Sequence, residues 1–490
     1  MPKLKIVMVA SEAAPFARTG GLGDVLGSLP KALAKLGHEV KVFLPRYRTI
    51  GGPIEPVPLG WTMPVSVAGK SVPMSLELLK GMRSKVEHYF VRNDFFFDRP
   101  EFYRDPETGK DYEDNDERFT FFSRAVLESI RKLGWQPDII HVNDWQAALI
   151  PVYMKTLYAD VPAISNARSV LTIHNLGYQG LFSGKRFEKL QLPRDLFYAM
   201  TGAFEFYGKV NFLKAGITYA DKITTVSRRY AEEIQSGDEF GCGLEGVLEQ
   251  RTKDLSGIVN GVDYTVWSPT RDKKIPYRYT INNLSGKRKN KVELLGFAHL
   301  PVRDRWPLIG MVTRLTAQKG LDLIEEAADE LFKLNLQMIV LGTGDEKYHE
   351  LLTEFEQKYP DRIKAFLKFD DTLAHRIEAA ADMFLMPSRW EPCGLNQLYS
   401  LRYGTVPIVR AVGGLADTVI DFDESTGKGT GFSFDEYESD AMLKAITRSL
   451  AQFKSKRAWA RIVKAGMNQD FSWDNSAAEY SSLFERLVAR

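Results

Sequence analysis

Short, fully apolar segments alternate with helix-length amphipathic segments along both halves of the chain. Nine segments have this strand-like character: residues 5–10, 39–44, 138–142, 169–173, 222–226, 308–312, 337–341, 382–386 and 406–409. Between them, leucines recur at helical spacing in residues 26–36, and a second helical pattern covers residues 320–332. Strands that are apolar on both faces are typical of parallel sheets covered by helices on both sides. We therefore predict an α/β fold with doubly wound parallel sheets.

The length of the chain indicates more than one such sheet. At about 150 residues per domain, 490 residues correspond to two or three domains. We predict an N-terminal domain of residues 1–256 that also takes the last helix, 471–490, and a C-terminal domain of residues 257–470. The basic stretch 271–290 is expected to be a solvated surface segment. Residues 95–118 show little periodicity and are expected to form a long surface loop.

Charge and cysteine content exclude several classes of protein. The formal net charge is only +2, so no electrostatic field favours nucleic acid or an anionic membrane as a partner. The two cysteines, Cys242 and Cys393, fit a reducing compartment and folding without disulfides. The apolar run at residues 6–10 is shorter than a secretion signal requires, and no run has the length of a membrane span. These features predict a cytoplasmic protein whose first strand is buried.

Candidate ligand-binding residues in the first half follow the predicted strands. Residues 18–24 (RTGGLGD) come after the first strand, and Gly20 and Gly21 there would let backbone N–H groups approach a phosphate. A plain turn is the alternative. Asp144 closes a later strand, and His174 with Asn175 closes another. Side chains at the carboxyl ends of parallel strands reach ligands, although His174 is equally compatible with a structural role.

The second half repeats this pattern with more charge. Arg314 and Lys319 lie between a strand and a helix, where two cations would converge on one diphosphate without a metal; a solvated loop is the alternative. Glu391 is enclosed by an aromatic residue and a proline at the start of a helix. Gly413 and Gly414 form a second Gly-Gly-Leu loop. Together the two halves predict a ligand held between two domains.

In combination, these motifs resemble those of the bacterial-type glycogen and starch synthases. That family comprises retaining glucosyltransferases of glycosyltransferase family 5, which have two Rossmann-like domains facing a cleft (the GT-B architecture). The resemblance covers essentially the whole chain. It is carried by residues 18–24, 111–125, 143–146, 174–180, 260–263, 314–320, 391–397, 413–415 and 429–432.

The resemblance implies transfer of glucose from ADP-glucose to the non-reducing end of an α-1,4-glucan or maltooligosaccharide, with retention of configuration. In this family the residues matching Arg314 and Lys319 stabilise the departing ADP, and the one matching Glu391 lies near the glucose ring. Expected catalytic residues are therefore Arg314, Lys319, Glu391, His174, Asp144 and Cys393. Expected donor-binding residues are Arg18, Gly20, Gly21, Asp24, Asn175, Asn260, Gly394, Leu395, Asn396, Gly413 and Gly414.

The chain departs from the family pattern at three positions. Arg18 replaces the usual Lys, Gln146 the usual His and Asn396 the usual Thr. A UDP-glucose-dependent synthase and a non-catalytic glucan-binding protein are the alternatives, and the latter would be expected to lose Arg314, Lys319 or Glu391. No pyridoxal-type lysine motif is recognised, so neither a pyridoxal cofactor nor a metal is predicted. The metal-like tripeptides 114–116 and 421–423 are expected to be surface loops.

Overall fold

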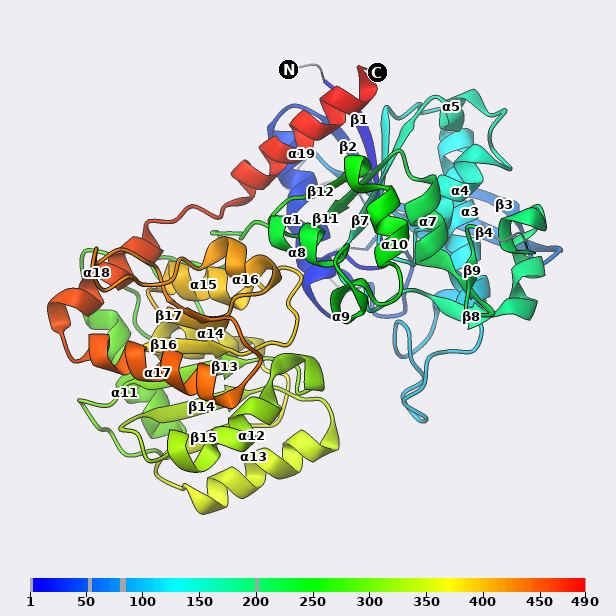
Figure 1. The fold of residues 1–490 in the computed structure, drawn as a ribbon. Helices are drawn as coiled ribbons and strands as arrows, with labels where there is room; N and C mark the ends of the chain where they lie inside the picture. The colour runs from blue at the N-terminus through cyan, green and yellow to red at the C-terminus, as the bar shows by residue number, and fades with distance from the viewer. Residues whose placement is uncertain (1–2, 52–54, 80–84, 199–201, 490) are drawn as a thin grey trace. The chain divides into compact units, whose positions relative to one another are not determined.

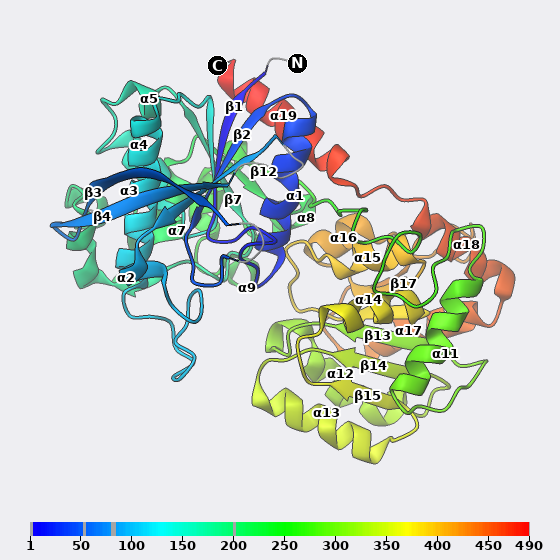
Figure 2. The same cartoon turned by 180° about the vertical axis from the view of Figure 1, so that it is seen from behind.

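A computed structural model describes residues 3–51, 55–79, 85–198 and 202–489. The chain forms two compact units (Figures 1 and 2). Unit 1 comprises Met1–Val226, Ala231–Gly261 and Trp473–Arg490, and unit 2 comprises Ser227–Tyr230 and Val262–Ser472. The last helix of the chain therefore belongs to the same unit as the first strand.

Unit 1 is built on a nine-stranded sheet within the described residues. The strand order is β12-β11-β7-β6-β1-β2-β5-β4-β3. The bounds are β1 Lys5–Val9, β2 Glu39–Pro45, β3 Val57–Val67, β4 Lys70–Leu79, β5 Glu87–Arg92, β6 Ile139–Asn143, β7 Arg168–Ile173, β11 Lys222–Thr225 and β12 Leu255–Gly257. All pairs from β12 to β5 are parallel, which confirms the predicted parallel sheet. The antiparallel hairpin of β3 and β4 at the edge was not predicted.

Helices cover both faces of this sheet. Helices α1 (Gly21–Lys35) and α19 (Trp473–Val488) pack on each other on one side, and α3 (Asn115–Leu133), α4 (Leu149–Lys155) and α7 (Phe212–Tyr219) lie on the other (Figures 1 and 2). Helix α19 buries an apolar stripe of Tyr480, Leu483, Phe484 and Leu487. The Tyr480 and Phe484 rings lie 5.5 and 5.6 Å from the ring of His141 in β6. The last helix thus lies within the predicted range 471–490, at Trp473–Val488.

Unit 2 contains a six-stranded sheet, all of it parallel, in the order β15-β14-β13-β16-β17-β18. The strands are β13 Leu308–Val312, β14 Gln337–Leu341, β15 Ile363–Phe366, β16 Met383–Met386, β17 Val406–Arg410 and β18 Phe432–Phe434. The helices are α11 Ser285–Phe297, α12 Leu321–Leu331, α13 Glu346–Lys358, α14 Asp371–Ala380, α15 Asn396–Tyr403, α16 Gly413–Thr418, α17 Ser439–Phe453 and α18 Lys456–Met467. The doubly wound fold predicted for the second half is confirmed.

Two apolar cores hold the layers of unit 2 together. Leu321, Ile324 and Leu331 of α12 share one core with apolar side chains of α13 and α17. A smaller core joins Trp267 to Tyr399 and Tyr403 of α15. The Trp267 and Tyr399 rings stack at 3.8 Å with an interplanar angle of 4°. Burying the apolar face of each helix in this way fixes where its first turn stands at the sheet edge.

The structure corrects the prediction for residues 95–118. The segment is not a plain surface loop, because a short helix, α2 (Asp94–Phe97), and the start of α3 lie within it. Arg118 is fully buried and donates to the backbone carbonyl oxygens of Phe96 and Phe102. Asp116, expected in a surface loop, is buried and pairs with Arg186 at 2.7 Å. A buried guanidinium with several acceptors organises this segment in place of hydrophobic periodicity.

The basic stretch 271–290 also differs from its prediction as a solvated segment. It leads into α11 and packs on unit 2, since Lys287 is buried and its Nζ donates to Thr405 Oγ1 at 2.6 Å. Lys291, just beyond, pairs with Asp382 at 2.6 Å. Burial lowers the pKa of Lys287 to about 7. A count of charges could not reveal these acceptors, which come from distant parts of the chain.

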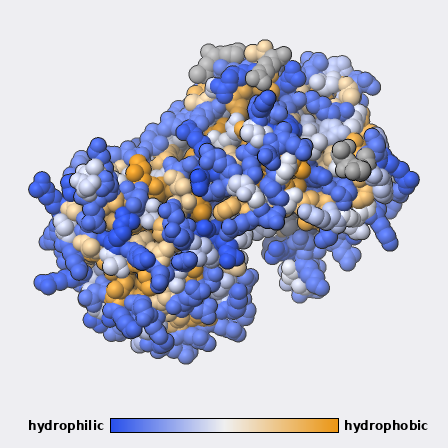
Figure 3. Space-filling model, in the orientation of Figure 1, coloured by the Kyte–Doolittle hydropathy of each residue, from blue (hydrophilic) through white to orange (hydrophobic). Residues whose placement is uncertain are grey.

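The face seen in Figure 3 carries mostly hydrophilic side chains, with hydrophobic ones scattered among them. Across the described residues, none of the helices has both the length and the apolar character needed to cross a bilayer. The tripeptide 421–423 does lie in a loop, with Asp421 and Asp423 exposed and Phe422 buried.

Candidate active site

In unit 2, two predicted residues form a nearly buried ion pair. Lys319 ends a short 3-10 turn (Ala317–Lys319) after β13, and Glu391 follows β16. Lys319 Nζ lies 2.6 Å from Glu391 Oε2, and the side chains are 14% and 9% exposed. Ser388 Oγ donates to the same carboxylate oxygen at 2.9 Å. Adjacent parallel strands thus bring a cation and an anion together at one sheet edge, as their positions after strands predict.

Backbone contacts join the two loops that carry this pair. Arg389 N donates to Gln318 O at 2.8 Å, and Gln318 Nε2 donates to Trp390 O at 2.9 Å. Gly320 has a φ of 72°, and a Cβ there would lie 2.0 Å from Pro387 O. No side chain fits at that distance, so glycine is required for the loops to approach so closely.

The Gly413–Gly414 loop packs directly against the Glu391 loop. Gly413 has a φ of 44°, and a Cβ on it would lie 2.0 Å from Glu391 O. A Cβ on Gly414 would lie 2.0 Å from Cys393 O, and Gly414 N donates to Glu391 O at 3.2 Å. These glycines therefore have a packing function: they let the first turn of α16 support the backbone that carries Glu391.

The remaining predicted residues of unit 2 lie around the start of α15. Cys393 is buried, and its carbonyl oxygen accepts from Gln397 Nε2 at 2.9 Å. Gly394, with a φ of 69°, and Leu395, at the N-cap, lead into the helix. The Asn396 side chain donates to Val312 O at the end of β13. Arg314, in contrast, is exposed on the loop after β13.

In unit 1, hydrogen bonds hold both the ring and the backbone of His174. Asn143 Nδ2 donates to Val9 O at 3.1 Å, so its Oδ1 faces His174 Nε2 at 3.0 Å. Because an amide oxygen only accepts, Nε2 of His174 must carry its proton. Asp144, in the left-handed region at a φ of 56°, accepts from His174 N through Oδ1 at 2.7 Å. Three strand ends thereby fix one imidazole.

Burial keeps this cluster close to neutral. It lowers the pKa of His174 to about 3, so the imidazole is uncharged near pH 7. It raises the pKa of Asp144 to about 7, and the backbone N–H groups of His174 and Asn175 oppose that rise. Asp144 therefore holds a proton in a substantial fraction of molecules at neutral pH. A strongly shifted carboxyl beside a histidine of fixed tautomer is typical of a functional site.

The loop of residues 18–24 in unit 1 contains an ion pair and two exposed glycines. Arg18 pairs with Asp24 through Nε and Oδ1 at 2.8 Å, with a second bond from Nη2 to Oδ2 at 3.1 Å. Gly20 is the N-cap of α1, exposed, and a Cβ on it would meet nothing within 4 Å. Its neighbour Gly21 is likewise exposed. Backbone N–H groups at this helix start are accessible to a ligand.

Sequence reasoning missed several residues that support the predicted ones. Buried Glu12 accepts from Thr19 N at 2.6 Å and from Tyr103 Oη at 2.7 Å, which anchors the 18–24 loop. Asn143 sets the tautomer of His174, and Ser388 holds Glu391. Asn143 ends the buried strand β6 and Glu12 follows the buried strand β1 by three residues, a signal that could have found them. Nothing local to Ser388 indicates its partner.

Asn260 and Gln146 each bury a side-chain oxygen in unit 1. The side-chain oxygens of Asn260, a predicted donor residue, and of Gln146 accept no hydrogen bond from any described residue. Buried acceptors of this kind are commonly satisfied by water or a ligand. The described ranges contain no group of three or more His, Cys, Asp or Glu residues arranged to hold a metal ion.

Comparison with known proteins assigns this chain to a family. Residues 5–250 match the model of the starch synthase catalytic domain, and residues 297–465 match that of glycosyl transferases group 1. A glycogen synthase of Koribacter versatilis is 48% identical over 99% of this chain and 98% of its own length. The chain belongs to the glycogen and starch synthase family. It is therefore a glucosyltransferase, as the sequence motifs predict.

Further relatives agree with this membership. A glycogen synthase of Thermotoga maritima is 45% identical over 99% of both chains. The catalytic domain of starch synthase IV from Arabidopsis thaliana, solved with ADP and acarbose bound, is 34% identical over the whole of both chains, with a TM-score of 0.91. Sucrose-phosphate synthase from Thermosynechococcus elongatus is 18% identical, covers 99% of this chain and has a TM-score of 0.63, which shows a shared GT-B fold.

Proposed function

We propose that the chain transfers glucose from ADP-glucose to the 4-hydroxyl at the non-reducing end of an α-1,4-glucan, with retention of configuration. The observation that carries this proposal is the Lys319–Glu391 pair at the carboxyl ends of β13 and β16 in a member of this family. ADP and the glucan analogue acarbose bound to the Arabidopsis relative support the two substrates. In this proposal unit 2 takes the nucleotide sugar and unit 1 the acceptor.

Unit 2 would supply the electrostatic part of catalysis. As the bond between glucose C1 and the phosphate oxygen breaks, the electron pair leaves with ADP and positive charge develops at C1. Lys319 and Arg314 would neutralise the diphosphate oxygens, and Glu391 would orient Lys319 and the sugar ring. Cations fixed before the reaction stabilise such a leaving group without reorganising. Gly394, Leu395 and Asn396 at the start of α15 would add backbone and amide contacts to the donor.

Unit 1 would supply neutral hydrogen bonds to the transferred sugar. His174, Asp144 and Asn175 stand together at strand ends, and His174 is uncharged near pH 7. A neutral imidazole can bond to a sugar hydroxyl without adding charge beside the cationic sugar centre. In a same-face transfer, the acceptor hydroxyl forms the new bond to C1 and loses its proton to the departing phosphate oxygen. Arg18, Gly20, Gly21 and Asp24 would contact the donor from the start of α1, and Asn260 of the same unit is a further proposed donor contact.

A donor competition assay tests the substrate. Purified protein is given radiolabelled ADP-glucose and a maltooligosaccharide, with unlabelled UDP-glucose or ADP-glucose as competitor. We expect label to enter the glucan and unlabelled ADP-glucose to compete at least about tenfold better than UDP-glucose, since one well-placed contact to the base suffices for that ratio. Equal competition would contradict the nucleotide assignment, and UDP-glucose preference would reverse it.

The same assay addresses the remaining alternatives. A non-catalytic glucan-binding protein would retain the oligosaccharide without incorporating label. We propose that no metal or pyridoxal cofactor takes part, so activity should survive dialysis against EDTA. Loss of activity that returns with added Mg²⁺ would contradict that statement. Cytoplasmic localisation remains a prediction from the sequence.

A further inference from the structure

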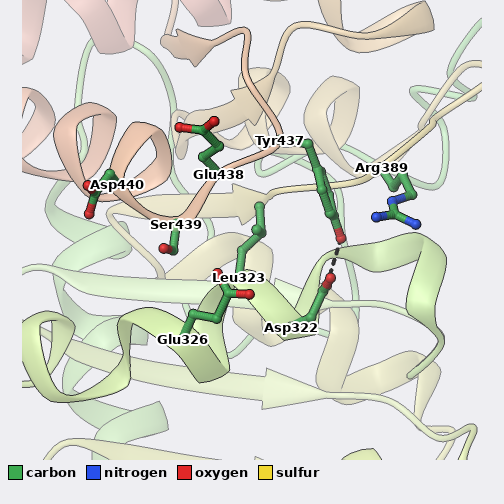
Figure 4. Close-up of a pocket in the computed structure, with 8 residues that line it drawn as sticks. All are labelled: Asp322, Leu323, Glu326, Arg389, Tyr437, Glu438, Ser439 and Asp440. Carbon is green, nitrogen blue, oxygen red and sulfur yellow. Dashed lines mark hydrogen bonds between the residues drawn. The ribbon is translucent and has the colours of Figure 1, made fainter.

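Tyr437 connects the two loops that carry Lys319 and Glu391. It lies between β18 and α17, and Figure 4 shows its hydroxyl directed at Asp322 and its ring beside Arg389. Tyr437 Oη donates to Asp322 Oδ1 at 2.6 Å. The guanidinium of Arg389 lies 4.7 Å from the centre of the ring, and that of Arg410 lies 5.2 Å from it.

Each of these residues that contact Tyr437 is either close in sequence to Lys319 or Glu391 or hydrogen-bonded to a residue that is. Asp322 is in the first turn of α12, three residues after Lys319. Arg389 is two residues before Glu391. Arg410, at the end of β17, donates from Nη1 to Arg389 O at 2.6 Å and from Nε to Asp435 O at 3.0 Å. Tyr437 therefore contacts the first turn of α12 through its hydroxyl, and the loop after β16 and the end of β17 through its ring.

The chemistry of these contacts favours a fixed arrangement. Burial, and then the Asp322 carboxylate, raise the pKa of Tyr437 above its ordinary value, so its hydroxyl remains a donor at any physiological pH. A hydrogen bond to a carboxylate is stronger than one between neutral groups. A guanidinium beside an aromatic face is held by the ring quadrupole, and here two guanidiniums share one ring.

We propose that Tyr437 is a positioning residue for glucosyl transfer, which holds the Lys319 and Glu391 loops at the spacing that the donor diphosphate requires. The inference rests on the proposed function, because it assumes that Lys319 binds the diphosphate. Tyr437 itself has no role in the chemical step, and it acts through Asp322 on one loop and through Arg389 on the other.

The first test is the affinity for ADP, measured by calorimetry. Tyr437→Phe keeps the ring beside Arg389 and Arg410 but removes the bond to Asp322. We expect its Kd for ADP to rise about three- to tenfold, as for other lost bonds to a charged partner. Tyr437→Ala also removes the ring and should cost more. With ADP-glucose as substrate, kcat should fall while KM for the maltooligosaccharide stays the same.

The chain offers a matched control. Tyr359 also donates its hydroxyl to an aspartate of α12, Asp329, but at the other end of that helix. Tyr359→Phe should change the ADP affinity less than about twofold, since neither partner contacts the Lys319 or Glu391 loops. If Tyr437→Phe and Tyr359→Phe have equal effects on ADP affinity, the positioning role is refuted.

A double-mutant cycle separates this proposal from the proposed function. If Tyr437 acts through Lys319, Tyr437→Phe should weaken ADP binding less than about twofold in the Lys319→Ala background. Additive losses would show that Tyr437 acts elsewhere and would overturn the inference. If Lys319→Ala alone leaves ADP affinity unchanged, the proposed function of Lys319 fails first, and the positioning role falls with it.

Substitutions of Asp322, the hydrogen-bond partner of Tyr437, provide a further test. Asp322→Asn keeps an oxygen that accepts from Tyr437, whereas Asp322→Ala removes it. The expected order of ADP affinity is unaltered chain, then Asp322→Asn, then Asp322→Ala. The double variant Asp322→Ala with Tyr437→Phe should bind ADP no more weakly than the weaker-binding of the two single variants. Equal losses from Asn and Ala would indicate that the charge of Asp322, and not its bond to Tyr437, matters, and would contradict the proposal.

Discussion

The same three residues, Gly-Gly-Leu, start a helix in each unit, but for different physical reasons. In unit 1, a Cβ on Gly20 would meet nothing within 4 Å, so the glycine leaves an open backbone at the start of α1. In unit 2, Gly414 is packed so closely that a Cβ would lie 2.0 Å from Cys393 O. A glycine pair in sequence therefore predicts a close approach, but not whether a ligand or the protein's own backbone makes it.

The candidate site residues of the two units also differ in their electrostatics. Unit 2 uses a charged pair, Lys319 and Glu391, whose charges compensate each other at 2.6 Å. Unit 1 uses His174 and Asp144, which burial keeps largely neutral near pH 7. The difference fits a division of work in which unit 2 meets the charged diphosphate and unit 1 meets the uncharged sugar. Each prediction below tests one side of this comparison.

The largest effect is expected from the charged pair. Lys319→Ala and Glu391→Ala should each lower glucan synthesis by about 10²- to 10³-fold, because each removes preorganised stabilisation of the departing ADP. The measurement is kcat with ADP-glucose and a maltooligosaccharide, with circular dichroism to verify folding. Lys333→Ala is the control, since Lys333 forms an exposed pair with Glu330 at 3.4 Å. Retention of more than about a tenth of the activity would place the chemistry elsewhere.

The glycine loops provide the second test. Gly414→Ala should lower the free energy of unfolding by about 2–4 kcal/mol, because its Cβ would overlap Cys393 O and the backbone must shift. Gly20→Ala should change it by less than about 0.5 kcal/mol, since its φ of −169° suits any residue. Urea unfolding of both variants measures the difference. Equal losses would show that the two loops are not distinguished by packing.

The third test uses the pH dependence of stability in unit 1. His174 has a folded pKa of about 3 and an ordinary value of 6.5, so between these values the unfolded chain binds the extra proton. Stability from this group is therefore lost as the pH falls through 6.5, by about 2 kcal/mol between pH 7 and pH 5. Asp144, with a folded pKa of about 7 and an ordinary value of 3.8, has the opposite sign over that range.

Two variants separate these opposing contributions. His174→Gln should make unfolding less sensitive to acid by about 2 kcal/mol between pH 7 and pH 5, and Asp144→Asn should make it more sensitive by a similar amount. Urea unfolding at the two pH values measures both. Since burial also lowers the pKa of His141 to about 3, part of the acid sensitivity should remain in the His174 variant. A parallel shift of both variants would contradict the assignment.

A structural feature of this protein could be predicted from the sequence when its signal lies within a short segment, and was missed when it depends on distant residues. The strands were predictable because each carries its own buried apolar run, as β13 (LIGMV) and β14 (QMIVL) do. The edge hairpin of β3 and β4 was missed, since most β3 residues remain at least partly exposed and no apolar run marks it. Lys287 was expected in solvent because its acceptor, Thr405, lies 118 residues away.

The candidate site shows the same limit. Lys319, Glu391, His174 and Asp144 were found because each follows a strand, and parallel strands gather their ends. Asn143 and Ser388 were not selected, because the sequence does not show which side chain each of them contacts, although the place of Asn143 at the end of β6 is a signal. The role of Gly413 and Gly414 could not be resolved without coordinates, since the contact with the Glu391 loop is what defines it.

The smallest effect is expected at Arg18, where the chain departs from the lysine usual in its family. Arg18 forms two bonds with Asp24, and both side chains are partly exposed, at 37% and 27%. Arg18→Lys replaces a planar fork by a point charge, so the pair with Asp24 becomes single. Because such surface pairs contribute little to folding, the stability should change by less than about 0.5 kcal/mol.

The effect of Arg18→Lys should therefore be confined to the donor. We expect KM for ADP-glucose to change by about two- to threefold while kcat is unaltered, since a residue that contacts substrate and transition state equally affects KM alone. Initial rates over a range of ADP-glucose concentrations give both constants. An unchanged KM would show that the exchange is neutral for the donor. A fall in kcat of about tenfold or more would instead give the exposed loop of unit 1 a part in the chemical step, and the contrast with the charged pair of unit 2 would no longer hold.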